Sequence, residues 1–340
     1  MDETLNKVAS IFSFIHLLFG LSLNILLYYL IFKKTTPVFK TMRYFLLPTN
    51  TSTMILSFLT SFLQVRTIFN KKSLAIMGQG YCKHFGAKAC FHTYGGFFVM
   101  GCVVGLLNLH TIFYRMICVK NRERRQVIRK TMLFCFHYLV PVIAISFFES
   151  AEFDIPSVYN ETLTVHPGYH LEPFGEFGGY ADARSIFPTL LTDTLCAICV
   201  YAPIFGYYCR WHALKKLDSS RTSLSDKSLL QVRTFINGLT LQVVLPLVCY
   251  VPIATTWMYN KYSGGDSIVV SEYFLGTLLV LPSVCDPLLT IYFIVPYRNA
   301  VKSFVQPKTT GSTSEEAENS SKPPTEMFQK VSAVSRTTCK

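Results

Sequence analysis

Long uncharged stretches separated by short charged ones constrain this chain more than any other feature of its sequence. Residues 8–32, VASIFSFIHLLFGLSLNILLYYLIF, contain no Asp, Glu, Lys or Arg. A helix needs about 20 apolar residues to cross a hydrocarbon core of roughly 30 Å. Seven stretches are predicted to be spans, at about residues 8–32, 44–64, 84–114, 131–148, 186–209, 234–258 and 273–296. A soluble protein can bury one such helix, but seven in succession predict an all-α membrane protein with a seven-helix bundle.

The charge content supports a bilayer as the surroundings of this chain. Only 15% of the 340 residues are charged, whereas soluble domains average about 25%. The net charge of +12 does not indicate a nucleic-acid partner, because the basic residues alternate with the predicted spans and no nucleic-acid-binding motif accompanies them.

Basic residues also predict which side of the membrane each connection occupies. The segments 33–43, 115–130, 210–233 and 298–340 hold 24 of the 32 Lys and Arg residues. Basic connections stay on the cytoplasmic side, so the N-terminus is predicted outside and the C-terminus inside. Residues 1–304 would form the seven-transmembrane domain, and residues 305–340, rich in Ser, Thr and Pro, a disordered cytoplasmic tail.

The longest predicted outer connection, residues 149–184, carries seven acidic residues and one Arg. It also contains Asn-Glu-Thr at Asn160, which is an acceptor motif for N-glycosylation. Because the connection lies on the predicted outer side, Asn160 is a predicted glycosylation site.

The last predicted span contains a carboxylate followed by a proline, Asp286 and Pro287. An ionised Asp at the centre of a membrane helix costs about 2.5–3.5 kcal/mol on insertion scales, so Asp286 is expected to face the bundle interior and to have a partner. Pro287 removes a backbone hydrogen bond and bends the helix. Asn24 and Asn50 are the expected hydrogen-bond partners. The pair is either a switch hinge or a structural polar clamp.

Three segments resemble a known family. PSVCDPLLTIYFIVPYR, residues 282–298, resembles the closing segment of nematode serpentine chemoreceptors of the Str-type superfamily. GLTLQVVLPLVCYVP, residues 238–252, resembles the sixth span of the same group. NLHTIFYRMICVKNR, residues 108–122, resembles the exit from its third span. The resemblance covers residues 8–304, and the delta class is the most similar.

The resemblance implies a chemosensory G-protein-coupled receptor in the plasma membrane of sensory-neuron cilia. Its implied partners are a small odorant-like ligand, a heterotrimeric G protein and membrane lipids. Tyr114, Arg115 and Tyr297 would act in G-protein coupling, with Pro246 letting the sixth span bend as it swings out. Two simpler explanations stay open, because Arg115 can be a positive-inside anchor and Pro246 can serve helix packing.

Candidate ligand contacts lie in the outer parts of the third, fifth and sixth predicted spans. His84, Lys88 and His92 are four residues apart and would share one helix face. Lys88 is expected to need a counter-charge, for which Asp193 is the candidate. Lys88 then pairs with Asp193, or one of them meets a polar ligand, or Lys88 extends toward the acidic outer connection. Trp257 is a further candidate ligand contact.

Neither a metal site nor a cofactor is predicted. Cys82 and His84, like Cys90 and His92, are two residues apart, so on a helix their side chains point about 200° away from each other. Cys82 is either free or bonded to Cys90 or another cysteine.

Two other function classes require sequence features that this chain does not show. An ion channel or transporter is the alternative function, but it should show a continuous polar stripe or duplicated halves, and neither is evident in the sequence. An enzyme is not predicted, because the histidines of the spans have no spacing that would build a catalytic centre.

Overall fold

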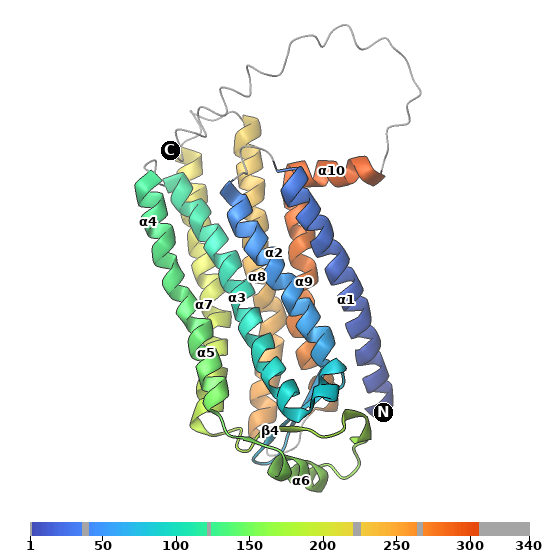
Figure 1. The fold of residues 1–340 in the computed structure, drawn as a ribbon. Helices are drawn as coiled ribbons and strands as arrows, with labels where there is room; N and C mark the ends of the chain where they lie inside the picture. The colour runs from blue at the N-terminus through green and yellow to red at the C-terminus, as the bar shows by residue number, and fades with distance from the viewer. Residues whose placement is uncertain (1, 36–40, 121–123, 220–225, 264–267, 306–340) are drawn as a thin grey trace.

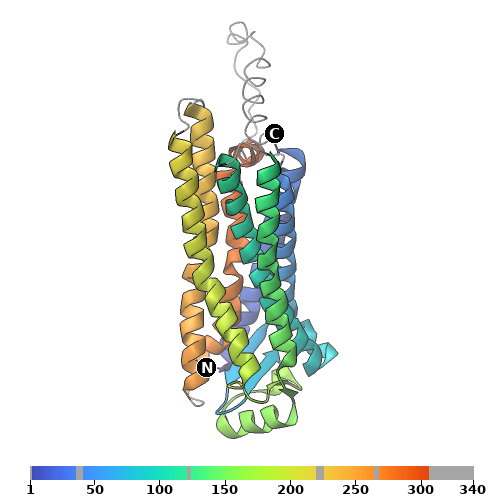
Figure 2. The same cartoon turned by 90° about the vertical axis from the view of Figure 1, so that its left-hand side faces the viewer.

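The computed structural model describes residues 2–35, 41–120, 124–219, 226–263 and 268–305. Long helices run side by side along one axis, and a short helix lies across one end of the bundle (Figure 1, Figure 2). The α-helices are α1 (Asp2–Lys33), α2 (Arg43–Leu63), α3 (Ala87–Lys120), α4 (Arg124–Phe134), α5 (Leu139–Ser150), α6 (Pro156–Val165), α7 (Ile186–Ser219), α8 (Asp226–Tyr262), α9 (Val269–Phe293) and α10 (Val295–Val305). The strands are β1 (Val65–Phe69), β2 (Leu74–Gly78), β3 (Phe153–Asp154) and β4 (Gly178–Tyr180). The 3₁₀ helices are η2 (Tyr81–Phe85), η3 (Cys135–Tyr138) and η4 (Glu172–Phe174).

We call each long helical stretch along the bundle axis a rod. The seven predicted spans correspond to seven rods. Six of them are the single helices α1, α2, α3, α7, α8 and α9, and the remaining one, fourth in chain order, is formed by α4, η3 and α5 together. Of the described helices, five are long and apolar enough to cross a membrane, or six if the bent pair of α9 and α10 counts as one span. Large apolar side chains such as Phe14, Phe19, Ile204 and Val248 are exposed on the outside of the rods. Such a surface is suited to lipid rather than to water.

The α2 helix is missing from that count because its sequence is rich in hydroxyl groups. Thr49, Thr53 and Thr60 each donate a hydrogen bond of 2.8–2.9 Å to the backbone carbonyl four residues earlier. A hydroxyl bonded in this way adds little polarity to the helix surface. The second rod can therefore belong to the bundle although its mean hydropathy is modest.

The bundle has two different ends. The strands, α6 and the beginning of α1 lie at one end, called the sheet end here, and α10 lies at the opposite end, called the α10 end (Figure 1). At the α10 end, α9 stops at Phe293 and α10 turns away by 94°. The last span is therefore slightly shorter than the predicted segment ending at residue 296.

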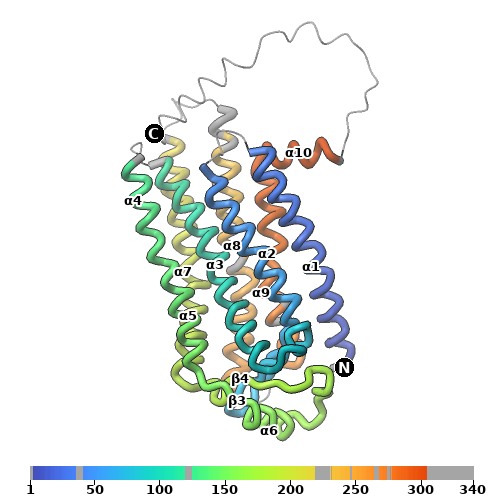
Figure 3. Tube along the Cα trace, in the orientation of Figure 1, coloured from blue at the N-terminus to red at the C-terminus, as the bar shows by residue number. Residues whose placement is uncertain are grey.

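A four-stranded antiparallel sheet in the order β1-β2-β4-β3 closes the sheet end. The sequence did not predict these strands, which come from the connections after α2 and α5. Figure 3 shows β3 and β4 at this end, close to α6. Gly179 lets β2 and β4 approach, because a Cβ atom there would lie 1.9 Å from the Leu74 carbonyl oxygen. We call the sheet and α6 the sheet cap.

The sheet separates two apolar clusters because its side chains alternate between two faces. Ile68, Ala75 and Met77 pack with Val158 of α6 on the outer face. Phe69, Leu74, Ile76 and Tyr180 pack with α3 and α5 on the inner face. The inner face therefore forms a roof over the bundle. Asn160 lies on the exposed side of α6.

A buried ion pair holds the sheet cap to the last rod. The Arg66 guanidinium of β1 donates to Glu272 at the start of α9, with Nη2–Oε2 at 2.8 Å and Nε–Oε2 at 3.1 Å. Both side chains are at most 1% exposed. Tyr169 donates to the other carboxylate oxygen at 3.1 Å, and its ring lies 4.7 Å from the guanidinium. We call Arg66 and Glu272 the cap ion pair.

A disulfide between Cys82 and Cys90 ties η2 to the start of α3. It selects one of the three alternatives that the sequence left open for Cys82. Because α3 begins at Ala87, His84 lies in η2 instead. The expectation that His84, Lys88 and His92 share one helix face is therefore wrong.

Candidate ligand cavity and polar core

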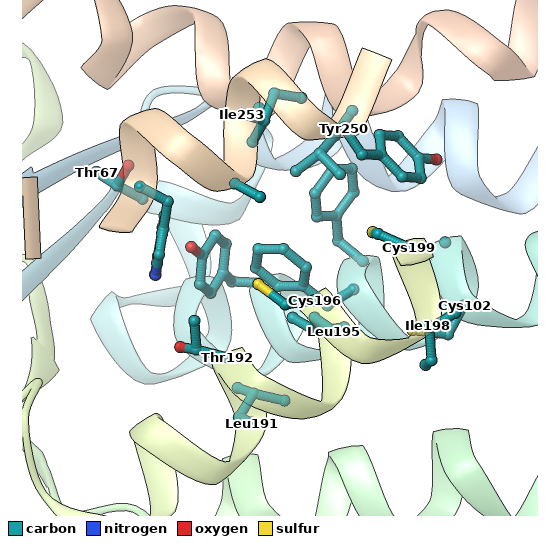
Figure 4. Close-up of a pocket in the computed structure, with 18 of the residues that line it drawn as sticks. Thr67, Cys102, Leu191, Thr192, Leu195, Cys196, Ile198, Cys199, Tyr250 and Ile253 are labelled. Carbon is teal, nitrogen blue, oxygen red and sulfur yellow. The ribbon is translucent and has the colours of Figure 1, made fainter. Parts of the chain in front are cut away.

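A cavity of about 140 Å³ lies inside the bundle beneath the sheet. Figure 4 shows Leu195 and Cys196 of α7 on one side, Tyr250 and Ile253 of α8 on the other, and Thr67 of β1 at one end. α3 supplies a further wall. The apolar lining also includes Phe69, Leu74, Tyr94, Phe97, Phe98, Leu191, Trp257 and Leu279.

Glycines on α3 help to make the cavity. Gly101 and Gly105 both line it, and a Cβ atom at either position would meet no heavy atom within 4 Å. At Gly95, by contrast, a Cβ atom would lie 2.6 Å from the Phe148 ring. The α3 helix therefore packs closely against α5 at Gly95 and leaves open space at Gly101.

Three polar groups interrupt the apolar lining near the sheet. Thr67 and Tyr180 come from β1 and β4, and Lys261 from the last turn of α8. Within the described residues, the Thr67 and Tyr180 hydroxyls are buried and have no hydrogen-bond partner. Lys261 is 4% exposed, and its ammonium donates to Thr189 Oγ1 at 3.0 Å. Burial raises the pKa of Tyr180 well above its usual value, so the phenol keeps its proton and remains a donor.

Of the predicted ligand contacts, only Trp257 lines this cavity, where it meets the Phe69 ring edge-on at 4.7 Å. Lys88 and Asp193 are exposed, and no contact between them is found in the described part of the chain. Asp193 is instead an electrostatic neighbour of Lys261. His92 is also exposed, and its Nδ1 lies 3.0 Å from Glu149 Oε1. A Lys88–Asp193 pair at a ligand site is therefore not formed.

Asp286 lies at the centre of a polar core on the α10 side of the cavity, and it is 3% exposed. Asn108 of α3 donates to its Oδ2 at 2.7 Å. Gln242 of α8 donates to the Asp286 backbone carbonyl at 3.1 Å and to Thr290 Oγ1 at 2.8 Å. Pro287, next in the chain, has no N–H to donate to the turn before it. The carboxylate thus joins α3 and α9, and Gln242 joins α8 to the same point.

The expectation that Asn24 and Asn50 bond to Asp286 is wrong. Asn50 donates to the Asn24 backbone carbonyl at 3.0 Å, and Asn24 donates to the Gly20 carbonyl at 2.6 Å. These amides connect α1 and α2 to each other. Both are buried, so the sequence correctly placed them inside the bundle but with the wrong partners.

Tyr114 and Arg115 lie where α3 approaches the α10 end. Tyr114 is buried and stacks on Phe45 of α2, with ring centroids 4.5 Å apart. The Arg115 guanidinium carbon lies 4.7 Å from the centroid of the Phe235 ring of α8. Arg115 therefore contacts the rod that the sequence interpretation expects to move.

Tyr297 and Pro246 are the remaining predicted switch residues. Tyr297 is fully buried at the start of α10, and its hydroxyl lies 2.7 Å from Thr35 Oγ1, just after α1. This contact ties α10 to the first rod. Pro246 lies within α8, but its side chain is outside the described residues.

Sequence reasoning missed Lys261, Thr67, Tyr180, Asn108 and Gln242. Lys261 could have been found from the sequence, because it is the single basic residue of the outer connection that follows the sixth predicted span. Asn108 could have been found as well, because it is a polar residue in a segment that carries the family resemblance. No sequence pattern indicated Thr67 or Tyr180, since the placement of these strand residues depends on pairing between distant connections.

Comparison with known proteins agrees with this architecture. A family model described as "Serpentine type 7TM GPCR chemoreceptor Srd" matches residues 9–303. Serpentine receptor class delta-63 of Caenorhabditis elegans is 34% identical over 276 residues, covering 81% of this chain and 85% of that protein. Serpentine receptor class delta-51 of the same worm is 27% identical over 334 residues, 97% of each chain.

Among solved structures, squid rhodopsin superposes with a TM-score of 0.58 over 97% of this chain and 91% of its own, at 13% identity. That likeness shows that the two chains share their fold, and it agrees with the 7TM GPCR description of the matching family model. The family model matches nearly the whole length of the helix bundle, and a relative at 34% identity covers 81% of this chain, so this chain belongs to the Srd family of serpentine chemoreceptors.

Proposed function

We propose that this chain is a chemosensory G-protein-coupled receptor of the plasma membrane, placed in sensory-neuron cilia. It binds a small molecule in the cavity beneath the sheet cap and activates a heterotrimeric G protein at the α10 end. Membership of a chemoreceptor family and the rhodopsin-like fold support the class. The observation that carries the ligand part of the proposal is the cavity itself, which is apolar and roofed by the sheet.

The size of the cavity favours a small ligand. An apolar cavity of about 150 Å³ in another protein binds benzene, and drug-sized ligands occupy clefts of roughly 300–1,000 Å³. At about 140 Å³, this cavity suits a molecule with the bulk of a single ring. Trp257 and Phe69 would supply the aromatic contact.

The distribution of charge supports an orientation with the sheet end outside. The connections on the α10 side and the segment after residue 298 hold most of the Lys and Arg residues, and such connections stay in the cytoplasm. The sheet cap and Asn160 would then face the exterior, where Asn160 is accessible for glycosylation.

Signalling would pass through the polar core to the α10 end. Gln242 links α8 to the backbone of Asp286, so an outward swing of α8 has to break that hydrogen bond. The same movement would separate Phe235 from Arg115 and expose Arg115 to a G protein. Tyr114, Tyr297 and Pro287 would keep the neighbouring rods in position.

Expression of the full-length chain in cells with a cAMP or calcium reporter, against a panel of small volatile compounds, tests this function. Arg115→Ala is expected to lower the response to an active compound at least tenfold at equal surface expression. Lys88→Ala, which changes an exposed residue at the other end of α3, serves as the control and is expected to leave the response unchanged. A current that persists when G proteins are removed would contradict the proposal and favour a channel.

A further inference from the structure

We infer that the cavity selects an apolar ligand carrying one hydrogen-bond acceptor, a carbonyl or carboxylate oxygen, which is held beneath the sheet by Thr67, Tyr180 and Lys261. This inference rests on the proposed function, because it names the ligand class for the same cavity. It differs from the pairing of Lys88 with Asp193 that the sequence suggested.

The three groups come from three separate elements but line one cavity. Thr67 lies on β1, Tyr180 on β4 and Lys261 on α8. Each of them is at most 4% exposed, so water outside the protein does not solvate them. Most of the other lining residues are apolar. Thr192 and Gln242 also line the cavity, but both already donate hydrogen bonds within the protein.

The two hydroxyls are the observation that points to a ligand. Buried side-chain hydroxyls nearly always have a hydrogen-bond partner, because an unpaired one loses its hydration without replacement. Within the described residues, neither Thr67 Oγ1 nor Tyr180 OH has such a partner. Both oxygens are covered by neighbouring atoms, so a ligand oxygen would supply the missing partner after a small shift of the side chains that line the cavity.

The chemistry of the three groups decides what the ligand carries. An ammonium group can only donate hydrogen bonds, while threonine and tyrosine hydroxyls can donate as well as accept. The common partner is therefore an acceptor. Asp193 is an electrostatic neighbour of Lys261, so part of the positive charge is already balanced, and both a neutral carbonyl and a carboxylate fit.

A purely structural role for Lys261 makes a different prediction. Its hydrogen bond to Thr189 joins α8 to α7, and this bond alone would stabilise the bundle without affecting ligand choice. Loss of Lys261 would then lower thermal stability and weaken all ligands equally. The inference predicts a change in selectivity instead.

The experiment measures binding of matched probes to the full-length receptor in lipid nanodiscs. Cyclohexanone and methylenecyclohexane have the same ring and differ only in a carbonyl oxygen against a CH₂ group, and cyclohexanecarboxylate adds charge. A hydrogen bond to a charged donor favours its acceptor by roughly tenfold or more. Wild-type receptor is expected to bind cyclohexanone at least about tenfold more tightly than methylenecyclohexane. Tighter binding of the carboxylate than of the ketone would identify an anionic ligand.

Lys261→Met is expected to reduce that preference to about threefold or less, while Lys261→Arg, which keeps a cationic donor, retains it. Thr67→Val and Tyr180→Phe should each lower the preference without lowering the unfolding temperature of the free receptor, because each removes an unpaired buried hydroxyl. Lys88→Met, the same change at an exposed lysine outside the cavity, should have no effect.

Equal affinity of the wild type for cyclohexanone and methylenecyclohexane would overturn the inference. A Lys261→Met receptor that prefers the ketone as strongly as the wild type does would also overturn it. Gly101→Phe, which fills the cavity, shows whether only the inferred ligand class is wrong or whether the cavity is not the binding site at all. If probes bind and Gly101→Phe does not weaken them, the cavity is not the ligand site. If no probe binds the wild type, the ligand class inferred here is wrong for molecules of this size.

Discussion

Asp286 shows how one buried carboxylate can connect several membrane helices. Its Oδ2 accepts from Asn108, and its backbone carbonyl accepts from Gln242. A charged residue at this depth persists only where such partners offset the loss of water. The sequence predicted a buried and partnered Asp286, but it could not tell which of several buried amides would reach it, because that depends on the rotation of each rod.

Replacement of Asp286 distinguishes its two possible roles, a hinge that switches during signalling and a polar clamp that only holds the helices together. Asp286→Ala should destabilise the receptor by about 1–3 kcal/mol, because the Asn108 amide loses its acceptor inside the bundle. Asp286→Asn keeps an acceptor oxygen and should lose less, as measured by thermal unfolding in nanodiscs. If the residue is a switch, Asp286→Asn also changes basal signalling in the reporter assay. Equal destabilisation by both variants would contradict the hydrogen-bond assignment.

At the scale of elements, the sheet cap is the part that sequence reasoning missed. β3 has two residues and β4 three, which is too short for a readable alternation of polar and apolar residues. Their pairing joins connections about a hundred residues apart in the chain, as in Leu74 opposite Tyr180. The long rods, in contrast, were predictable because each must satisfy its own backbone within the bilayer.

The cap ion pair predicts how the sheet cap is held. Arg66→Met should destabilise the receptor by about 3–5 kcal/mol, because it removes the guanidinium that donates two hydrogen bonds to the buried Glu272 carboxylate. Adding Glu272→Leu should recover much of that loss, since the second substitution removes the buried carboxylate as well. Thermal unfolding of the two variants and the wild type measures both effects.

Lys7→Met is the matched control, because Lys7 pairs with Glu3 at 2.7 Å where both side chains are more than 70% exposed. Exposed pairs contribute little to stability, so no measurable change is expected. A double variant no more stable than Arg66→Met would show that the contacts around the cap ion pair, and not its charges, hold the sheet cap.

For the whole molecule, the sequence predicted the seven-helix bundle and, through quoted motifs, its family. It also placed Trp257 and Asp286 within spans and Arg115 at the end of the third span. Trp257 lines the cavity, Asp286 accepts from Asn108 in the polar core, and Arg115 contacts α8. The cavity itself was not predictable, because it is enclosed by α3, α7, α8 and a sheet that no local pattern reveals. Lys88 and Asp193 were selected by their charge and His92 by its spacing from Lys88, yet all three side chains are exposed.

The proposed function requires that a molecule in the cavity beneath the sheet controls G-protein activation at the opposite end of the bundle. The most direct measurement compares Gly101→Phe with Gly96→Phe in the reporter assay. Both glycines lie on α3 and have room for a Cβ atom, but only Gly101 lines the cavity. At equal surface expression, Gly101→Phe is predicted to abolish the response to an active compound, and Gly96→Phe to preserve it. A Gly101→Phe receptor that responds like the wild type would contradict the claim.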